Sequence, residues 1–243
     1  MYGKAVAASL LLGISSLASA EPAIWLAGDS TVATYPANRA PMAGWGQMLG
    51  EFCRPEVKVN NRAVGGRSTK SFIDEKRWDK ILKGLKPGDF VFIQFGHNDQ
   101  KKEKPEVFAD ADSSYQELLK KYISETREKG ATPILVTSMY RRIFKDNKLS
   151  DTLGKYPEAM KKVAAETKTA LIDLHSISAL EFAKAGAEGT KKIFLHAAPG
   201  ELPNYPKGIT DNSHFSENGA RMIAGWIVED AKKQQLDVAK LFK

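Results

Sequence analysis

Four short segments, far apart in the chain, contain the residue types that ester cleavage by a serine requires. A serine hydroxyl is a weak nucleophile at neutral pH, so the reaction needs a base, a group that orients the base, and hydrogen-bond donors aimed at the developing oxyanion. Each of these roles has a candidate in the sequence. The segments are Gly28-Asp29-Ser30-Thr31, Gly65-Gly66-Arg67-Ser68, Gly96-His97-Asn98-Asp99 and Asp211-Asn212-Ser213-His214.

The residue types suggest how the roles divide. Ser30 is the candidate nucleophile, His214 the candidate base, and Asp211 the candidate carboxylate that holds the imidazole of His214 in one tautomer. The backbone N–H groups of Ser30 and Gly66 and the side-chain amide of Asn98 are candidate oxyanion donors. The predicted chemistry is acyl transfer through a serine ester.

Each segment taken alone also has a simple structural interpretation. A Gly-Asp-Ser turn after a strand is ordinary helix-entry chemistry, and a glycine pair serves tight turns. Asp211 and His214, followed by Ser216 as an N-cap, fit a helix start. Asn98 fits a role in tying down its loop, and we favour a buttress over a base for His97. The Gly-x-Ser-x-Gly spacing of a nucleophile elbow is absent, which disfavours an ordinary α/β-hydrolase.

The segments are embedded in a chain that alternates short apolar runs with stretches of helical character. The apolar runs predict buried parallel strands at 23–27, 57–60, 90–95, 133–137 and 170–174. Helices are predicted at 44–53, 71–82, 113–129, 156–167, 176–185 and 217–234. This order predicts an α/β fold with a parallel sheet covered by helices on both faces.

The candidate site residues all follow strands or precede the last helix. Ser30 follows the first predicted strand, Gly66 the second and Asn98 the third, while Asp211 and His214 precede the helix at 217–234. In an open parallel sheet, ligands bind outside the carboxyl ends of the strands. We therefore expect the four segments to meet at one rim of the sheet.

Residues 1–20 have the pattern of a secretory signal peptide. Lys4 precedes an apolar run from Ala5 to Leu12, and Ala18-Ser19-Ala20 fits a cleavage site of small residues. A membrane anchor is disfavoured because this run is much shorter than the roughly 20 residues that span a bilayer. We predict a signal peptide over 1–20, one esterase domain over 21–243, and export to the periplasm or the medium.

Cysteine and histidine usage argues against a disulfide or a metal centre. Cys53 is the single cysteine of the 243 residues, so it cannot form an internal disulfide. Its position after Leu49 and Phe52 in a predicted helix favours a small buried residue. His175 and His196 lack metal-ligand spacing with acidic partners and are interpreted as structural or surface residues. We predict no metal and no cofactor.

Basic residues outnumber acidic ones. The sequence has 36 Lys and Arg against 29 Asp and Glu, a formal net charge of +7. Such a surface attracts polyanions in general, whether nucleic acid, anionic lipid or acidic polysaccharide. No nucleic-acid-binding motif accompanies the charge.

Taken together, the serine, glycine, asparagine and histidine segments resemble the SGNH (GDSL-like) hydrolase superfamily. Longer matches resemble its rhamnogalacturonan acetylesterase group, although Gly65 stands where some relatives carry alanine. The resemblance implies a three-layer α/β/α fold with a flavodoxin-like open parallel sheet of about five strands, and catalytic roles for the residues assigned above. The longer matches are 28–32, Gly44-Trp45-Gly46-Gln47, 61–68, 94–99 and 211–215.

The resemblance also implies a substrate. Its group removes O-acetyl groups from pectin, chiefly rhamnogalacturonan, and some members act on acetylated xylan or small acetylated sugars. Basic residues in the loops after the third and fourth strands suit an acidic galacturonate chain, although a solvated basic surface explains them as well. Tyr205 and Trp45 are candidates for stacking on sugar rings, or else anchors of a loop or the core. The basic candidates are Lys101, Lys102, Arg141 and Arg142.

Two other functions stay open. A lipolytic or thioester hydrolase of the same superfamily would keep the site and add a long apolar channel for the acyl chain. A catalytically silent sugar-binding module would require a vestigial site, yet every component is present. The expected partner is an acetylated acidic polysaccharide or oligosaccharide bound by a monomer, with no nucleic acid and no membrane insertion after signal cleavage.

Overall fold

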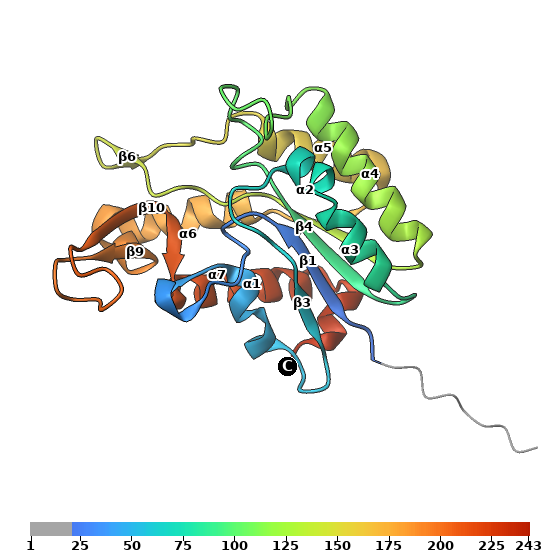
Figure 1. The fold of residues 1–243 in the computed structure, drawn as a ribbon, viewed down its shortest axis with the longest axis horizontal. Helices are drawn as coiled ribbons and strands as arrows, with labels where there is room; N and C mark the ends of the chain where they lie inside the picture. Colours follow the sequence, from blue (N-terminus) through green and yellow to red (C-terminus); the bar gives the residue numbers. More distant parts are fainter. Residues whose placement is uncertain (1–20) are drawn as a thin grey trace, which may run out of the picture.

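Five parallel strands form the central sheet of the computed structural model, which describes residues 21–243 (Figure 1). Their order in the sheet is β3-β1-β4-β5-β8, and every neighbouring pair is parallel. This is a flavodoxin-like order, so the predicted open parallel sheet is confirmed. The predicted signal peptide over 1–20 lies outside the described residues. The strands are β1 (Ile24–Gly28), β3 (Val59–Asn61), β4 (Phe90–Gln94), β5 (Thr132–Val136) and β8 (Ala170–Ile172).

Helices cover both faces of this sheet (Figure 1). One face packs against α1 (Trp45–Met48), α6 (Leu174–Gly189) and α7 (Glu217–Lys233). The other packs against α2 (Thr69–Asp74), α3 (Arg77–Gly84), α4 (Ser114–Glu128) and α5 (Tyr156–Thr167). The predicted three-layer α/β/α architecture is therefore confirmed.

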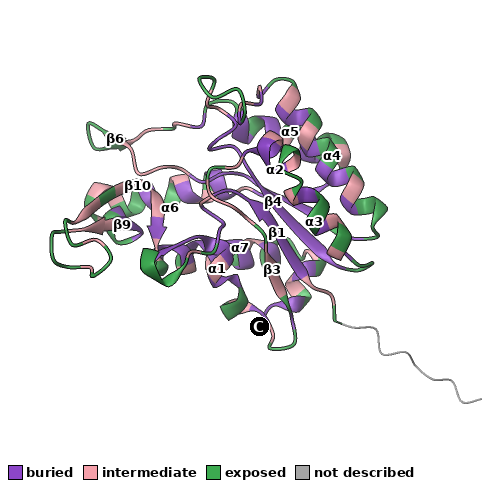
Figure 2. Ribbon diagram, viewed as in Figure 1, coloured by how far each residue is buried: buried purple, intermediate pink, exposed green. Residues whose placement is uncertain are grey.

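Strands β1 and β4 are almost entirely apolar because both faces of the sheet are buried there. All residues of β1 and β4 are buried, and Figure 2 shows the central strands as a buried layer. Ile24 and Leu26 enter the core under α1, α6 and α7, while Trp25 and Ala27 enter the core under the other four helices. Alternation along a strand thus builds two hydrophobic cores from one apolar run.

Three predicted helices differ from the structure by more than one residue at an end. The stretch 71–82 forms two helices, α2 and α3, because Lys76 adopts a left-handed conformation (φ 55°) between them. The stretch 44–53 is α1 followed by the 3-10 helix η2 (Leu49–Phe52). Helix α6 starts two residues earlier than predicted, where Asp173 caps it by accepting a hydrogen bond from the Ser176 backbone, and it continues past a kink at Gly186 (φ 68°) to Gly189.

A second, antiparallel sheet was not expected from the sequence. It has the order β2-β10-β9, with β2 (Met42–Ala43), β9 (Phe194–Ala197) and β10 (Ile209–Ser216). The segment 198–208 is the connection between β9 and β10. The remaining elements are the hairpin β6 (Phe144–Lys145) with β7 (Lys148–Leu149) and the 3-10 helices η1 (Ala37–Arg39), η3 (Thr190–Lys192) and η4 (Asp237–Leu241).

Cys53 lies in the core, as predicted. Its side chain is 2% exposed, and its Sγ lies 3.4 Å from the backbone oxygen of Leu49. Burial raises the pKa of the Cys53 thiol to about 11, so the thiol stays protonated at neutral pH. Within residues 21–243, no helix has the length and apolar character needed to cross a bilayer.

Candidate active site

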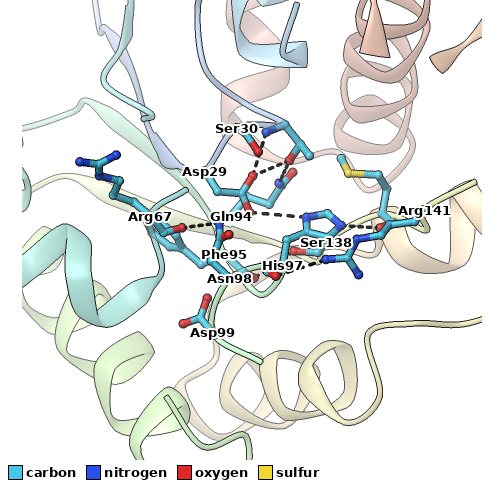
Figure 3. A network of polar contacts seen from close by, with 12 residues as sticks. Asp29, Ser30, Arg67, Gln94, Phe95, His97, Asn98, Asp99, Ser138 and Arg141 are labelled. Carbon is cyan, nitrogen blue, oxygen red and sulfur yellow. Dashed lines mark hydrogen bonds and ion pairs between the residues drawn. The ribbon is translucent and has the colours of Figure 1, made fainter. Parts of the chain in front are cut away.

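Ser30 lies in the turn that follows β1, and its neighbours fix that turn by buried hydrogen bonds (Figure 3). The Asp29 carboxylate, which is fully buried, accepts hydrogen bonds from the backbone N–H of Thr31 at 2.9 Å and from its hydroxyl at 2.7 Å. The Thr31 hydroxyl in turn accepts one from the amide of Gln94 at 2.6 Å. Trp45 donates to the Gln94 oxygen at 2.7 Å and is fully buried, so it anchors the core and does not reach a sugar.

Asp211 and His214 form the expected carboxylate-imidazole pair on β10. His214 Nδ1 lies 2.7 Å from Asp211 Oδ2, while Asp211 Oδ1 accepts from the backbone N–H groups of Ser213 at 2.8 Å and His214 at 2.9 Å. Because the carboxylate accepts at Nδ1, the proton of a neutral imidazole sits there and leaves a lone pair on Nε2. A base with its free nitrogen on Nε2 is the form that serine activation needs.

The charge of Asp211 is stabilised by these hydrogen bonds. Burial alone would raise the pKa of Asp211, but the bonds from the His214 ring and from the His214 and Ser213 backbones lower this pKa to about 2. The carboxylate is therefore ionised at any pH at which the His214 ring is neutral, and its charge favours the protonated form of that ring.

An irregularity in β10 brings His214 toward Ser30. The pairing of β10 with β9 shifts register between Asp211 and Phe215, and the Asp211 carboxylate closes the turn in between. Ser213 and His214 consequently line the same cavity as Ser30, which has a volume of about 360 Å³. The structure therefore places Ser30 and His214 at one cavity, but within the described chain it shows no hydrogen bond between the serine hydroxyl and the imidazole.

Two of the candidate oxyanion donors come from the loops after β3 and β4. Gly66 lines the cavity and has φ of 80°, a left-handed conformation that favours glycine. Gly65 lies beside the nucleophile, since a Cβ added to it would be 3.5 Å from the Ser30 Cβ. Asn98, which is 4% exposed, also lines the cavity. The third candidate donor is the backbone N–H of Ser30 itself.

The amide of Asn98 is held at both ends. Its nitrogen donates to the backbone oxygen of Arg67 at 2.9 Å, and its oxygen accepts from the Lys101 ammonium at 2.6 Å. This pattern fixes which end of the amide is the nitrogen. One N–H of the amide is used by Arg67, and the second remains for a ligand in the cavity.

His97 is a buried residue of the same loop. Its Nε2 lies 3.1 Å from the carbonyl oxygen of Met139, which can only accept, so Nε2 is a donor. Its Nδ1 lies 3.5 Å from Asp29 Oδ2 (Figure 3). His97 therefore connects the turn after β1 with the chain after β5, a geometry that supports a buttress and not a base.

The predicted basic substrate residues are largely occupied by protein partners. Lys101 lines the cavity but binds Asn98. Arg141 lines it too, while its guanidinium donates to the Thr152 hydroxyl at 2.9 Å and to the His97 carbonyl at 3.2 Å. Lys102 is exposed and does not line the cavity.

Arg142 and Tyr205 lie outside the cavity lining. Arg142 donates to the Asn212 side-chain oxygen at 3.0 Å and to the Ala187 carbonyl at 2.6 Å, so it braces the loop between Asp211 and His214 from behind. The Tyr205 hydroxyl donates to the backbone oxygen of Arg39 at 2.9 Å. Tyr205 thus anchors a loop, the second of the two interpretations given for it above.

Thr31, Tyr35 and Arg39 line the cavity although sequence reasoning missed them. The Tyr35 hydroxyl donates to the Ser30 carbonyl at 2.8 Å, and burial followed by the charge of Asp29 raises the pKa of Tyr35 to about 12. Tyr35 is therefore a neutral donor that steadies the nucleophile's backbone. Thr31 belongs to the first of the four segments but was given no role there, whereas Tyr35 and Arg39 belong to no motif and only their proximity to Ser30 in the sequence could have suggested them.

The remaining histidines have structural partners. His175 stacks on Tyr140 with ring centroids 4.4 Å apart, and His196 Nε2 lies 2.9 Å from the side-chain oxygen of Asn212. Among residues 21–243, no group of three or more His, Cys, Asp or Glu side chains could hold a metal ion. The chemistry available at the cavity is that of serine, imidazole, carboxylate and hydrogen-bond donors.

A flavodoxin-like sheet with serine, glycine, asparagine and histidine at one cavity defines a class of ester hydrolases. The profile of the GDSL-like Lipase/Acylhydrolase family matches residues 26–222, and the chain belongs to this family. The protein is therefore an esterase, and the family resemblance found in its sequence is confirmed.

Individual relatives are similar over most of the chain. The rhamnogalacturonan acetylesterase RhgT of Bacillus subtilis is 44% identical over 207 residues, which cover 85% of this chain and 88% of that protein. The probable rhamnogalacturonan acetylesterase YesY of the same organism is 38% identical over 89% of this chain and 95% of its own length.

Solved structures share the fold. The crystal structure of the B. subtilis protein YxiM superposes with a TM-score of 0.75 at 30% identity, covering 89% of this chain and 57% of that one. The acetylxylan esterase Axe2 of Geobacillus stearothermophilus gives a TM-score of 0.61 at 18% identity, over 87% of this chain and 94% of that chain. At that identity the second likeness concerns the fold alone.

Proposed function

We propose that this esterase removes O-acetyl groups from a pectic polysaccharide, rhamnogalacturonan, through an acyl-enzyme on Ser30. The observation that carries the proposal is the 2.7 Å contact of Asp211 with His214 Nδ1, in a cavity lined by both His214 and Ser30. This arrangement leaves the other ring nitrogen as a base near the serine. The similarity to two relatives named for rhamnogalacturonan supports the substrate.

In the proposed reaction, His214 Nε2 takes the Ser30 proton as the serine oxygen bonds to the acetyl carbonyl carbon. The carbonyl π electrons move to oxygen, and this oxyanion accepts hydrogen bonds from the Ser30 and Gly66 backbones and the free N–H of Asn98. The bond to the sugar oxygen then breaks, and the imidazolium returns its proton to that oxygen. Asp211 stays ionised throughout and stabilises the imidazolium.

Water completes the cycle. His214 takes a proton from a water molecule whose oxygen attacks the acetyl-serine carbonyl. The second oxyanion then collapses, the bond to the Ser30 oxygen breaks, the imidazolium returns its proton to that oxygen, and acetic acid leaves and ionises to acetate. The same donors serve both steps because the two oxyanions form at the same carbonyl carbon. A cavity of about 360 Å³ suits a sugar bearing one small acyl group.

The charge of the cavity lining supports an acidic glycan. Arg39, Lys101 and Arg141 line it, and no described Asp or Glu does. A lining of this kind attracts the carboxylates of galacturonate. Export of the chain after cleavage of residues 1–20, and action as a monomer, belong to the same proposal, because pectin lies outside the cell.

Acetate release tests this function. Wild type, Ser30→Ala and Ser124→Ala would each be assayed on acetylated rhamnogalacturonan, acetylated xylan and 4-nitrophenyl acetate. Ser124 is an exposed serine of α4 and serves as the matched control. We expect release by wild type and the control to be greatest on rhamnogalacturonan and to be lost in Ser30→Ala.

The three substrates separate the parts of the proposal. Undiminished hydrolysis by Ser30→Ala would refute the mechanism. Ser30-dependent release from xylan in preference to rhamnogalacturonan would keep the mechanism and refute the pectic substrate.

A further inference from the structure

The cations that line the catalytic cavity differ in what they already bind. Lys101 is held by Asn98, and Arg141 by Thr152 and the His97 carbonyl. Arg39 has no carboxylate within ion-pair distance in the part of the chain that the structure describes, and its one side-chain hydrogen bond is to the Met42 sulfur at 3.4 Å. Among residues 21–243, Lys101 and Arg141 also have no carboxylate at ion-pair distance, but their N–H groups are used by neutral oxygens of the protein. Arg39 is therefore the lining cation whose N–H groups are least engaged and most available to a ligand.

Arg39 is also next to the residues that hold the nucleophile. Its guanidinium carbon lies 5.9 Å from the ring centroid of Tyr35, and the Tyr35 hydroxyl donates to the Ser30 carbonyl at 2.8 Å. An exposed guanidinium on an aromatic face keeps its N–H groups available at its edges. Arg39 is thus placed beside the serine and is still able to bind.

The backbone that carries Arg39 is fixed from a distant part of the chain. Arg39 is the last residue of η1, and its carbonyl accepts from the Tyr205 hydroxyl at 2.9 Å. The Asn204 amide donates to the carbonyls of Ala37 at 3.0 Å and Ala40 at 2.8 Å. Three hydrogen bonds from the β9–β10 connection therefore hold this exposed turn in position.

We propose that Arg39 binds the carboxylate of a galacturonate unit of the bound glycan, and so selects an acidic glycan. The planar guanidinium fork matches a carboxylate bidentately, with a geometry that an ammonium does not offer. The proposal rests on the proposed function, because it places the acetyl group at Ser30 and the uronate carboxylate at the mouth of the same cavity. Tyr205 and Asn204 act through the turn as positioning residues.

The test compares an acetylated rhamnogalacturonan oligosaccharide, the same oligosaccharide after reduction of its carboxyl groups to alcohols, and 4-nitrophenyl acetate. The variants are Arg39→Gln, Arg39→Lys and Lys240→Gln. Lys240 lies in η4 and does not line the cavity, so its replacement controls for the change of net charge.

We expect Arg39→Gln to lower kcat/KM on the acidic oligosaccharide about 10-fold, the lower range for hydrogen bonds to a charged group. The loss should lie mainly in KM, should shrink at high salt, and should be absent on the two neutral substrates. Arg39→Lys should recover part of it, and Lys240→Gln should match wild type. Tyr205→Phe should give a smaller loss that is again confined to the acidic oligosaccharide.

Other results overturn the proposal. An equal loss on all three substrates would mean that Arg39 acts on the serine turn and not on a carboxylate. A wild-type preference for the acidic oligosaccharide that persists in Arg39→Gln would overturn the role of Arg39 and keep the pectic substrate. If wild type hydrolysed the acidic and reduced oligosaccharides equally well, the role of Arg39 would be overturned, whereas the proposed function would fail only if release from xylan exceeded release from rhamnogalacturonan.

Discussion

Replacement of Lys101 tests whether the hydrogen bond from its ammonium group to the Asn98 amide oxygen contributes to catalysis. The Lys101 ammonium lies 2.6 Å from the amide oxygen, and the Arg67 carbonyl holds one N–H at 2.9 Å. Lys101→Met removes the cation and keeps a chain of similar length. The amide oxygen then loses its charged partner, so the remaining N–H is both a weaker donor and less firmly oriented.

The size of the effect has an upper bound. Removing an oxyanion donor costs about 10² to 10³ in kcat, which is the loss expected for Asn98→Ala. Lys101→Met leaves the donor in place, so we expect a fall in kcat of about 10-fold, comparable to the lower range for a hydrogen bond with a charged partner. KM for 4-nitrophenyl acetate should not change, because this ester has no carboxylate for Lys101 to bind.

A double-mutant cycle supplies the assay. Wild type, Lys101→Met, Asn98→Ala and the double variant would be compared by kcat and KM on 4-nitrophenyl acetate and on the acidic oligosaccharide. If Lys101 acts through Asn98, adding Lys101→Met to Asn98→Ala costs nothing further. Losses that multiply in the double variant would refute the reasoning, as would a loss confined to KM on the acidic substrate.

Three further predictions concern single residues. Asp211→Asn should lower kcat on 4-nitrophenyl acetate about 10³- to 10⁴-fold, because an amide no longer holds the base in its productive tautomer; near-normal turnover would exclude Asp211 from the triad. Burial raises the pKa of Asp99 to about 7, so the folded protein keeps a proton that the unfolded chain loses near pH 4. Stability should therefore fall as pH rises from about 4 to 7, and thermal unfolding of Asp99→Asn should show a flatter profile; an identical slope would contradict this. Gly219→Ala should destabilise the protein by about 1 to 3 kcal/mol in urea unfolding, since its Cβ would lie 1.9 Å from the Ile193 carbonyl oxygen. Gly225→Ala, on the same helix, meets only ordinary contacts at 3.6 Å and should be neutral or slightly stabilising, so equal losses in both would refute the steric argument.

The central sheet was predictable because its physical cause is visible in sequence. A strand buried on both faces is apolar at nearly every position, and β1 and β4 are apolar up to Gln94 at the carboxyl end of β4. Helix α5 coincides with its prediction over Tyr156–Thr167, where apolar residues recur at helical spacing. A helix or strand that buries one or both faces has apolar residues at a regular spacing, and this spacing can be recognised in the sequence.

The antiparallel sheet was not predictable because its strands lack such a regular apolar pattern. Strand β10 carries Asp211, Asn212 and His214, so polar residues interrupt any alternating pattern, and its register shifts at this point. Its partner β2 has two residues, Met42 and Ala43, which is too short for a periodic signal. The polar candidate site residues in β10 interrupt the alternation of apolar and polar residues that would have identified it as a strand.

Assignments of substrate-binding residues depend on a different kind of information. Lys101, Arg141 and Arg142 are basic and lie in the expected loops, but their charge says nothing about which partners they already have. Arg142 is engaged by Asn212 and the Ala187 carbonyl, contacts that only the tertiary structure creates. Whether a basic side chain is available to a ligand depends on its contacts in the folded protein, and a single sequence does not show these contacts.

The middle residue of the Gly-Asp-Ser segment shows how two of the four segments, 28–31 and 96–99, are connected. Burial alone would raise the pKa of Asp29, but contacts with His97 and hydrogen bonds from Thr31 bring it below its ordinary value, so Asp29 is a buried anion. Its Oδ2 lies 3.5 Å from the His97 ring, one residue before Asn98. The turn that carries Ser30 and the loop that carries Asn98 are thus joined beneath the cavity by a buried polar contact (Figure 3). The interior of the protein thus connects the turn of the candidate nucleophile to the loop of a candidate oxyanion donor, while Arg39 lies exposed at the rim of the cavity.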